Sequence, residues 1–127
     1  MILLEIVKFI HILIDIIISS YIFIFSPIYD IYYAGFVFIQ TLHWAALKNE
    51  CVITYIEKLL IDPNYELGSN IKYQPHTETY HNNITLLLKA ILIIGTLTII
   101  MYRSKNKYAK LFAGLAIILW IYFTYLY

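Results

Sequence analysis

Residues 2–25 read ILLEIVKFIHILIDIIISSYIFIF, and most of them are Ile, Leu, Val or Phe. About 20 mostly apolar residues in a helix are enough to cross a hydrocarbon core roughly 30 Å thick. This segment is therefore long enough to span a membrane, and Ser26 and Pro27 end it. Because it lacks the basic start and the small-residue cleavage site of a signal peptide, we expect it to be a retained helix.

Three further apolar runs follow, over residues 31–47, 84–102 and 111–127. The chain is 61% hydrophobic and only 13% charged, whereas about a quarter of the residues in an ordinary soluble domain are charged. Contact with lipid over most of the surface explains this composition. We therefore predict an all-α fold, an integral membrane four-helix bundle, with residues 1–127 as a single transmembrane domain and the first span at about 2–25.

The second predicted helix extends beyond its membrane span. Residues 31–60 contain no Pro and no Gly except Gly35, so we expect a continuous helix of about 45 Å. Towards its end, Glu50 and Glu57 recur on one side and apolar residues occupy another. We interpret this end as the solvated extension of a long helix, which stops before Pro63.

A polar stripe runs along the first span. Its four ionisable residues are three, three and four positions apart, on one side of a helix: Glu5, Lys8, His11 and Asp15. Each ionised group costs about 2.5–3.5 kcal/mol at the centre of a bilayer, so we expect the stripe to face the inside of the bundle. His11 and Asp15 are four residues apart and can pair on the same helix.

Residues of the other spans reach the depth of this stripe. Counted from the connection at residues 26–30, His11 and His43 lie at nearly the same height in two antiparallel helices. By the same count, Glu50 approaches the first turns of the chain, and Lys89 reaches the same layer. We therefore predict a buried intramembrane polar cluster that consists of Glu5, Lys8, His11, Asp15, His43, Glu50 and Lys89.

Three functions are compatible with the predicted cluster. As a structural device it determines which helix sides pack together, and we expect a structural or accessory component of a membrane assembly. Alternatively, His11, Asp15 and His43 form a proton relay in a proton- or ion-conducting oligomer. In the third interpretation, His11 and His43 bind haem or a metal ion. Apart from that interpretation, we expect no cofactor and no metal site.

Other reactive side chains form no recognisable catalytic set. Cys51 and His43 are eight residues apart and nearly at right angles around a helix, and the sequence specifies no third group to orient them. We therefore predict no catalytic residues, and the sequence does not indicate an enzyme. His76 and His81 lie in the loop between the second and third spans, where we expect both to be solvated rather than metal-bound.

Basic residues indicate how the spans are oriented. The short connection over residues 103–110 contains Arg103, Lys105, Lys107 and Lys110, and short loops rich in Lys and Arg stay on the cytoplasmic side. We therefore expect this loop on the cytoplasm-like side and both termini opposite. The net charge of +1 does not favour nucleic acid. The expected partners are the lipid bilayer and either further copies of the chain or other membrane subunits.

A short motif begins near the end of the second span: His43-Trp44, then Asn49, then Cys51-x-x-Thr54-x-x-Glu57. This motif resembles one found in small multi-span membrane proteins of large DNA viruses of algae and other protists, with Ile53 in place of the usual Leu. The resemblance covers about fifteen residues and the surrounding hydropathy. It implies a viral protein in a virion or host membrane, and it implies no catalytic activity.

Overall fold

The computed structural model describes residues 2–78 and 82–127. Its five α-helices are α1 (Ile2–Ile24), α2 (Asp30–Ala46), α3 (Val52–Ile61), α4 (Asn83–Arg103) and α5 (Lys107–Ile121). Three short turns accompany them: η1 (Pro27–Tyr29), η2 (Pro75–Thr77) and the π-helical η3 (Tyr122–Leu126). The described residues contain no strand, which confirms the all-α prediction.

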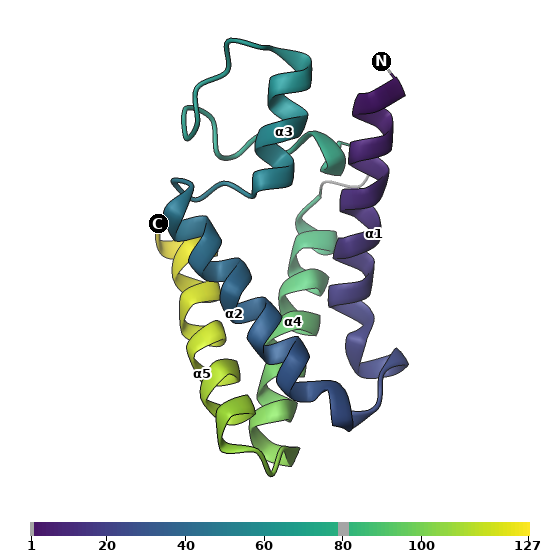
Figure 1. Ribbon diagram of the computed structural model, residues 1–127, viewed down its shortest axis with the longest axis vertical. Coiled ribbons are helices and arrows are strands. Elements are labelled where there is room, and N and C mark those ends of the chain that lie inside the picture. Colours follow the sequence, from purple (N-terminus) through teal and green to yellow (C-terminus); the bar gives the residue numbers. More distant parts are fainter. Residues whose placement is uncertain (1, 79–81) are drawn as a thin grey trace.

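The helices α2, α4 and α5 form the main packed unit, in which α5 contacts both of the others (Figure 1). Ala109, Ala113 and Ala116 of α5 are fully buried, as are Ala34 and Val37 of α2. Such small side chains let helix backbones approach closely. α1 packs along α4, while α3 lies beyond the end of α2 and beside the N-terminal half of α1.

An ion pair stabilises the end of the molecule at which α4 and α5 are connected. Arg103 Nε and Nη2 donate hydrogen bonds of 2.8 and 2.7 Å to the two carboxylate oxygens of Asp30. The Tyr21 hydroxyl donates a third bond of 2.8 Å to the same carboxylate. Asp30 is 2% exposed, so one buried carboxylate connects α1, α2 and α4. We call this arrangement the Asp30–Arg103 pair.

The second helix does not continue past its apolar run, which corrects the prediction for this segment. Residues 47–51 separate α2 from α3. Lys48 and Asn49 have φ angles of 52° and 65°, in the left-handed region that ends many helices and that Asn adopts more readily than most residues. The Asn49 amide donates to the Trp44 carbonyl at 2.7 Å, and its side chain donates to the Phe123 carbonyl at 2.9 Å. The second bond stabilises the reversal and depends on a residue far away in the chain.

Two of the described helical segments are long and apolar enough to cross a membrane, by length and composition. They are α4 and the segment Lys107–Leu126, which joins α5 to η3. α1 has 23 residues and α2 has 17. Both direct large apolar side chains outward, for example Phe9 in α1, which is 61% exposed, and Ile39 in α2, which is 65% exposed. Membrane crossing by α1 and α2 stays a prediction.

Candidate functional site

The short helix α3 turns its polar side toward the rest of the protein. Thr54, Glu57 and Lys58 are buried, whereas Val52 and Ile56 are 44% and 43% exposed. A helix lying on a water-soluble protein buries its apolar side instead. α3 packs against α1 and η2, so Glu57 is an interior residue rather than the solvated residue that the sequence predicts.

Two histidines and two carboxylates meet where α1, α3 and η2 come together. We call this group the imidazole–carboxylate cluster, and its members are His11 and Asp15 of α1, Glu57 of α3 and His76 of η2. His11 Nδ1 lies 3.0 Å from Glu57 Oε1. His76 Nε2 lies 3.2 Å from Asp15 Oδ2, and His76 Nδ1 lies 3.4 Å from Glu57 Oε2. The two imidazole rings stack with their centroids 3.5 Å apart.

Local structure explains how these side chains reach one another. His11 and Asp15 are four residues apart in α1 and therefore lie on the same side of that helix. Pro75 starts η2, where its fixed φ suits the first helical position. The Thr77 hydroxyl then donates 2.8 Å to the carbonyl three residues before it. This turn holds His76, which is 3% exposed, against α1 and α3.

Two further groups contact the imidazole–carboxylate cluster. Lys89 of α4 places its Nζ 3.1 Å from Asp15 Oδ1, and Cys51 places its Sγ 3.8 Å from His11 Nε2. The cluster is thereby connected to α4 on one side and to the first residue before α3 on the other. The predicted cluster included Lys89 but not Cys51.

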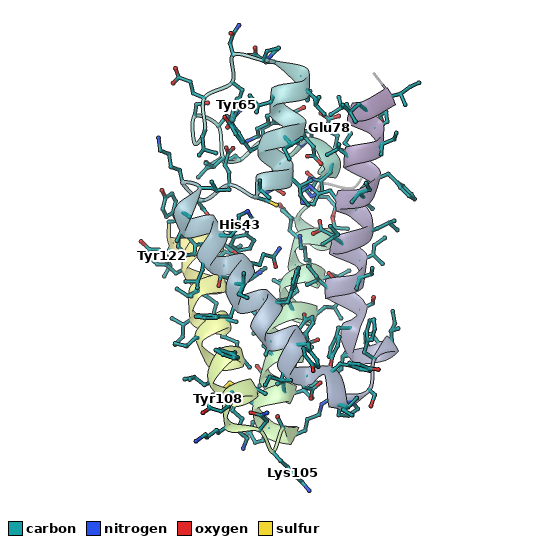
Figure 2. All side chains as sticks on the ribbon, in the orientation of Figure 1. His43, Tyr65, Glu78, Lys105, Tyr108 and Tyr122 are labelled. Carbon is teal, nitrogen blue, oxygen red and sulfur yellow. The ribbon has the colours of Figure 1, made fainter. Side chains whose placement is uncertain are left out.

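Glu5 and Lys8 lie at the outer edge of the polar stripe of α1. Lys8 Nζ is 3.5 Å from Glu5 and 3.9 Å from Glu78, and Figure 2 shows Glu78 between α3 and α1. The side chain of Glu5 is 70% exposed. Of the two, Lys8 is thus partly enclosed, whereas Glu5 faces outward rather than into a buried cluster.

His43 lies outside the imidazole–carboxylate cluster, which corrects the predicted set. Its Nε2 accepts a 2.8 Å hydrogen bond from the Val52 amide at the start of α3, and Figure 2 shows it near the α3 end of α2. The imidazole that stacks on His11 is His76. Neither the relay through His11, Asp15 and His43 nor a haem held by His11 and His43 matches this arrangement. The chain reversal after α2 is the reason, because it brings α3 and η2 to α1.

Glu50 belongs to a separate buried group beneath the loop that follows α3, which also corrects the predicted set. Its carboxylate accepts hydrogen bonds from Lys58, from the Tyr65 hydroxyl at 2.6 Å and from the Gly68 amide at 3.1 Å. Lys58 also donates to the Asn70 carbonyl at 2.6 Å. These bonds fold the loop, in which Figure 2 labels Tyr65, back onto α3. Burial raises the pKa of Glu50, but the hydrogen bonds from Lys58, Tyr65 and Gly68 together outweigh burial, and the net pKa is lowered.

Two residues of the imidazole–carboxylate cluster, Glu57 and His76, were not among the predicted site residues. The prediction that His76 is solvated is wrong, because the turn that begins at Pro75 buries it; the same prediction for His81 lies outside the described residues. Thr54 and Glu57, three residues apart on one side of α3, were a usable signal. In a chain with so little polar surface, a polar side of a helix can face inward.

The two histidines of the cluster lower the pKa values of the acidic groups beside them. Burial raises the pKa of Glu57, but the imidazoles of His11 and His76 outweigh burial and hold that pKa well below its usual range. Burial likewise raises the pKa of the Cys51 thiol, while the hydrogen bond with His11 lowers it, and the net shift is downward. Glu57 is therefore ionised at neutral pH, and Cys51 loses its proton more readily than an ordinary cysteine.

Comparisons with other proteins give this chain no relative. No family model, curated protein or solved structure matches it.

The arrangement permits three kinds of chemistry. Opposite charges in contact stabilise the packing of the segments that carry them. A series of imidazoles and carboxylates within hydrogen-bond distance can pass a proton. Finally, His11, Glu57 and His76 each offer one atom able to bind a metal ion, and these three atoms lie within 4.8 Å of one another.

Proposed function

We propose that this chain is a four-span membrane protein that acts as a structural or accessory component of a membrane assembly. α4 and the segment Lys107–Leu126 have the length and composition of membrane spans, and α1 and α2 carry many exposed apolar side chains. Large exposed apolar surfaces of this kind are stable against lipid or another protein. The connection over residues 103–110 faces the cytoplasm-like side and both termini lie opposite. In support, Figure 1 places both termini away from that connection.

One observation carries the structural role: the imidazole–carboxylate cluster is enclosed within a single chain. His11, Glu57 and His76 are 5%, 0% and 3% exposed. A conducting path needs water or further proton carriers at both ends, whereas an enclosed cluster stabilises the contact between the segments that supply it. The cluster connects α1 to α3 and η2, and each hydrogen bond of this type contributes about 0.6 kcal/mol in membrane proteins.

The partners are further copies of the chain or other membrane subunits. In lipid, small residues and polar groups drive helix association, because apolar side chains gain little by leaving a hydrocarbon solvent. Gly95 of α4 has nothing within 4 Å of the position of a Cβ, so another helix backbone can approach there. The resemblance of residues 43–57 to viral membrane proteins supports a virion or a host membrane as the location.

Thiol accessibility tests the membrane arrangement. Single cysteines introduced as Lys105→Cys and Lys72→Cys, each in a Cys51→Ala background, are labelled with a membrane-impermeant maleimide in intact cells and in inverted vesicles. We expect Lys72→Cys to react from the outside and Lys105→Cys only from the cytoplasmic side. Reaction of both positions from one side refutes the topology, and native mass spectrometry that finds a monomer without partners refutes the assembly role.

A second candidate, a proton-conducting oligomer, rests on a different observation. The contacts form an unbroken series from Cys51 through His11, Glu57 and His76 to Asp15, with steps of 3.8, 3.0, 3.4 and 3.2 Å. Proton flux in reconstituted vesicles distinguishes the two functions. Flux that disappears in a Glu57→Gln variant with wild-type fold favours conduction, whereas absence of flux in the wild type leaves the structural role.

A further inference from the structure

We propose that His11, Glu57 and His76 bind one divalent transition-metal ion of the Zn²⁺ class. Each residue offers one ligand atom, and the three atoms lie within 4.8 Å of one another. All three side chains are buried, so only a small ligand such as a single ion can bind between them. The site is formed within one chain, and its existence does not depend on the structural role or on membrane crossing.

The spacing of the ligand atoms suits a small ion. His11 Nδ1 is 3.0 Å from one carboxylate oxygen of Glu57, Oε1, and His76 Nδ1 is 3.4 Å from the other, Oε2, so the two imidazoles approach the two oxygens of one carboxylate. Atoms bound at about 2.0–2.1 Å to a tetrahedral Zn²⁺ ion are roughly 3.3 Å from one another. Small movements of the three side chains are therefore enough to place an ion between the imidazoles and the carboxylate.

Two of the ligand atoms have no other role among the described residues. Glu57 Oε2 and His76 Nδ1 are buried and have no hydrogen-bond partner in the described part of the chain. They lie within ion-pair distance of each other, but not in hydrogen-bonding geometry. A buried polar atom without a partner costs about 1–3 kcal/mol. A metal ion bound to both atoms removes that cost.

The opposite ring nitrogens already have partners that orient the imidazoles. His76 Nε2 donates to Asp15 at 3.2 Å, and Lys89 pairs with the other oxygen of Asp15 at 3.1 Å. A carboxylate in this position is typical of metal-binding histidines, because it fixes the tautomer and leaves the other nitrogen free to bind. For His11 the corresponding neighbour is the sulfur of Cys51, 3.8 Å from Nε2.

The ligand types narrow the choice of metal. Two imidazoles and one carboxylate are a common set in zinc sites with three protein ligands, where water takes the fourth position. Ca²⁺ and Mg²⁺ prefer oxygen ligands throughout, so this set disfavours both. Because Lys89 offsets the charge of Asp15, Glu57 supplies the anionic ligand. A metal ion binds only an unprotonated ring nitrogen, so any proton on His11 Nδ1 is released to solvent when the ion binds.

A Co²⁺ titration tests the proposal, because Co²⁺ substitutes for Zn²⁺ in protein sites and absorbs visible light when it is bound there. Full-length protein is purified in detergent without a histidine tag, treated with EDTA and titrated. We expect one equivalent of Co²⁺ to produce the absorption bands of a four-coordinate ion, and Zn²⁺ to abolish them. A wild-type protein that binds neither ion at micromolar concentration overturns the proposal.

Variants identify the ligands. Glu57→Gln and His76→Gln remove one ligand each at similar side-chain size, and we expect Co²⁺ binding to be lost. Asp15→Asn keeps all three ligands, so we expect one ion to bind with about 10- to 100-fold lower affinity. His43→Gln is the matched control, because it changes a histidine outside the site and keeps an acceptor for Val52. Unchanged affinity in both ligand variants overturns the proposal.

X-ray absorption at the zinc edge keeps the proposal testable if the ligand variants fail to fold. We expect the spectrum of the wild-type protein to show two imidazole ligands and oxygen ligands from a carboxylate or water around Zn²⁺. A spectrum with no imidazole, or with sulfur as the main ligand, contradicts the assigned set. A positive result in a protein that proves not to cross the membrane leaves the metal site standing, so the two proposals fail separately.

Discussion

The two ends of this molecule use buried charge in different ways. At the end where α4 meets α5, one carboxylate, Asp30, receives two bonds from Arg103 and one from Tyr21. At the α3 end, the carboxylates of Glu57 and Asp15 share two stacked imidazoles. In the first arrangement both carboxylate oxygens of Asp30 accept hydrogen bonds. The second leaves two buried polar atoms without hydrogen-bond partners among the described residues.

A structural ion pair differs from a site able to bind a ligand in how completely its polar atoms are paired. A guanidinium and a carboxylate match each other in shape and in number of hydrogen bonds. An imidazole has two ring nitrogens, each of which donates or accepts one hydrogen bond. It is also the commonest metal ligand in proteins. We therefore expect only a structural role for the Asp30–Arg103 pair, whereas for the imidazole–carboxylate cluster we propose both a structural role and metal binding.

The largest expected effect is at the Asp30–Arg103 pair. Asp30→Asn removes the charge that balances Arg103, and breaking a buried pair typically costs about 3–5 kcal/mol. Because the side chain of Arg103 is 29% exposed and can turn to solvent, we expect a loss near the lower limit. Equilibrium unfolding in mixed detergent measures it, with Lys105→Ala as the control. Equal stability of Asp30→Asn and Lys105→Ala contradicts the assignment.

Added Zn²⁺ is expected to stabilise only those variants in which the imidazole–carboxylate cluster is intact. At one hundred times its Kd, a ligand that binds only the folded state raises the unfolding free energy by about 2.7 kcal/mol. We expect this gain in the wild type and in Asp30→Asn, and no gain in Glu57→Gln. Thermal unfolding with and without Zn²⁺ measures it. A gain in Glu57→Gln would place the ion elsewhere in the chain.

A smaller effect concerns the loop after α3, which Glu50 holds through Lys58 and Tyr65. Because the pKa of Glu50 is lowered in the folded protein, the unfolded state binds the proton more tightly. The contribution of Glu50 to the free energy of unfolding is therefore complete above the ordinary glutamate pKa of about 4.3. It is lost as pH falls through the lower pKa of the folded state. We expect proteolysis of the loop to accelerate below pH 4.3 or so. Acceleration at neutral pH instead would count against Glu50.

The smallest effect is expected at His43. His43→Phe removes the acceptor for the Val52 amide, and a neutral hydrogen bond contributes about 0.5–1.5 kcal/mol. We expect a loss of that size, with Zn²⁺ binding intact. A larger loss together with loss of Zn²⁺ binding would mean that His43 acts on the metal site after all.

The helix α1 was predictable because its three- and four-residue spacing has a direct geometric meaning. That spacing puts His11 and Asp15 on one side of a helix, and the cost of burying charge in lipid directs that side inward. Lys89 was matched to the same layer by helix rise alone, and the structure places it 3.1 Å from Asp15.

The remaining half of the site depends on contacts that spacing along the chain does not contain. The reversal at Asn49 rests on a bond to the Phe123 carbonyl, 74 residues away. A continuous helix in its place would carry Glu57 away from α1. His76 is buried because η2 packs on α1 and α3, and no local pattern specifies that contact. Length and composition identify two candidate membrane spans, α4 and Lys107–Leu126. Four membrane crossings therefore stay a prediction.

Hydrogen–deuterium exchange tests whether the imidazole–carboxylate cluster attaches α3 and η2 to α1 independently of the Asp30–Arg103 pair. The wild type, Glu57→Gln and Asp30→Asn are compared in the same detergent. We predict that Glu57→Gln accelerates amide exchange in α3 and residues 62–78 and leaves the ends of α2 and α4 at the Asp30–Arg103 pair unchanged, and that Asp30→Asn does the reverse. Wild-type exchange rates in α3 of Glu57→Gln, or the same pattern in both variants, would show that the cluster does not attach α3 and η2 to α1 in this way.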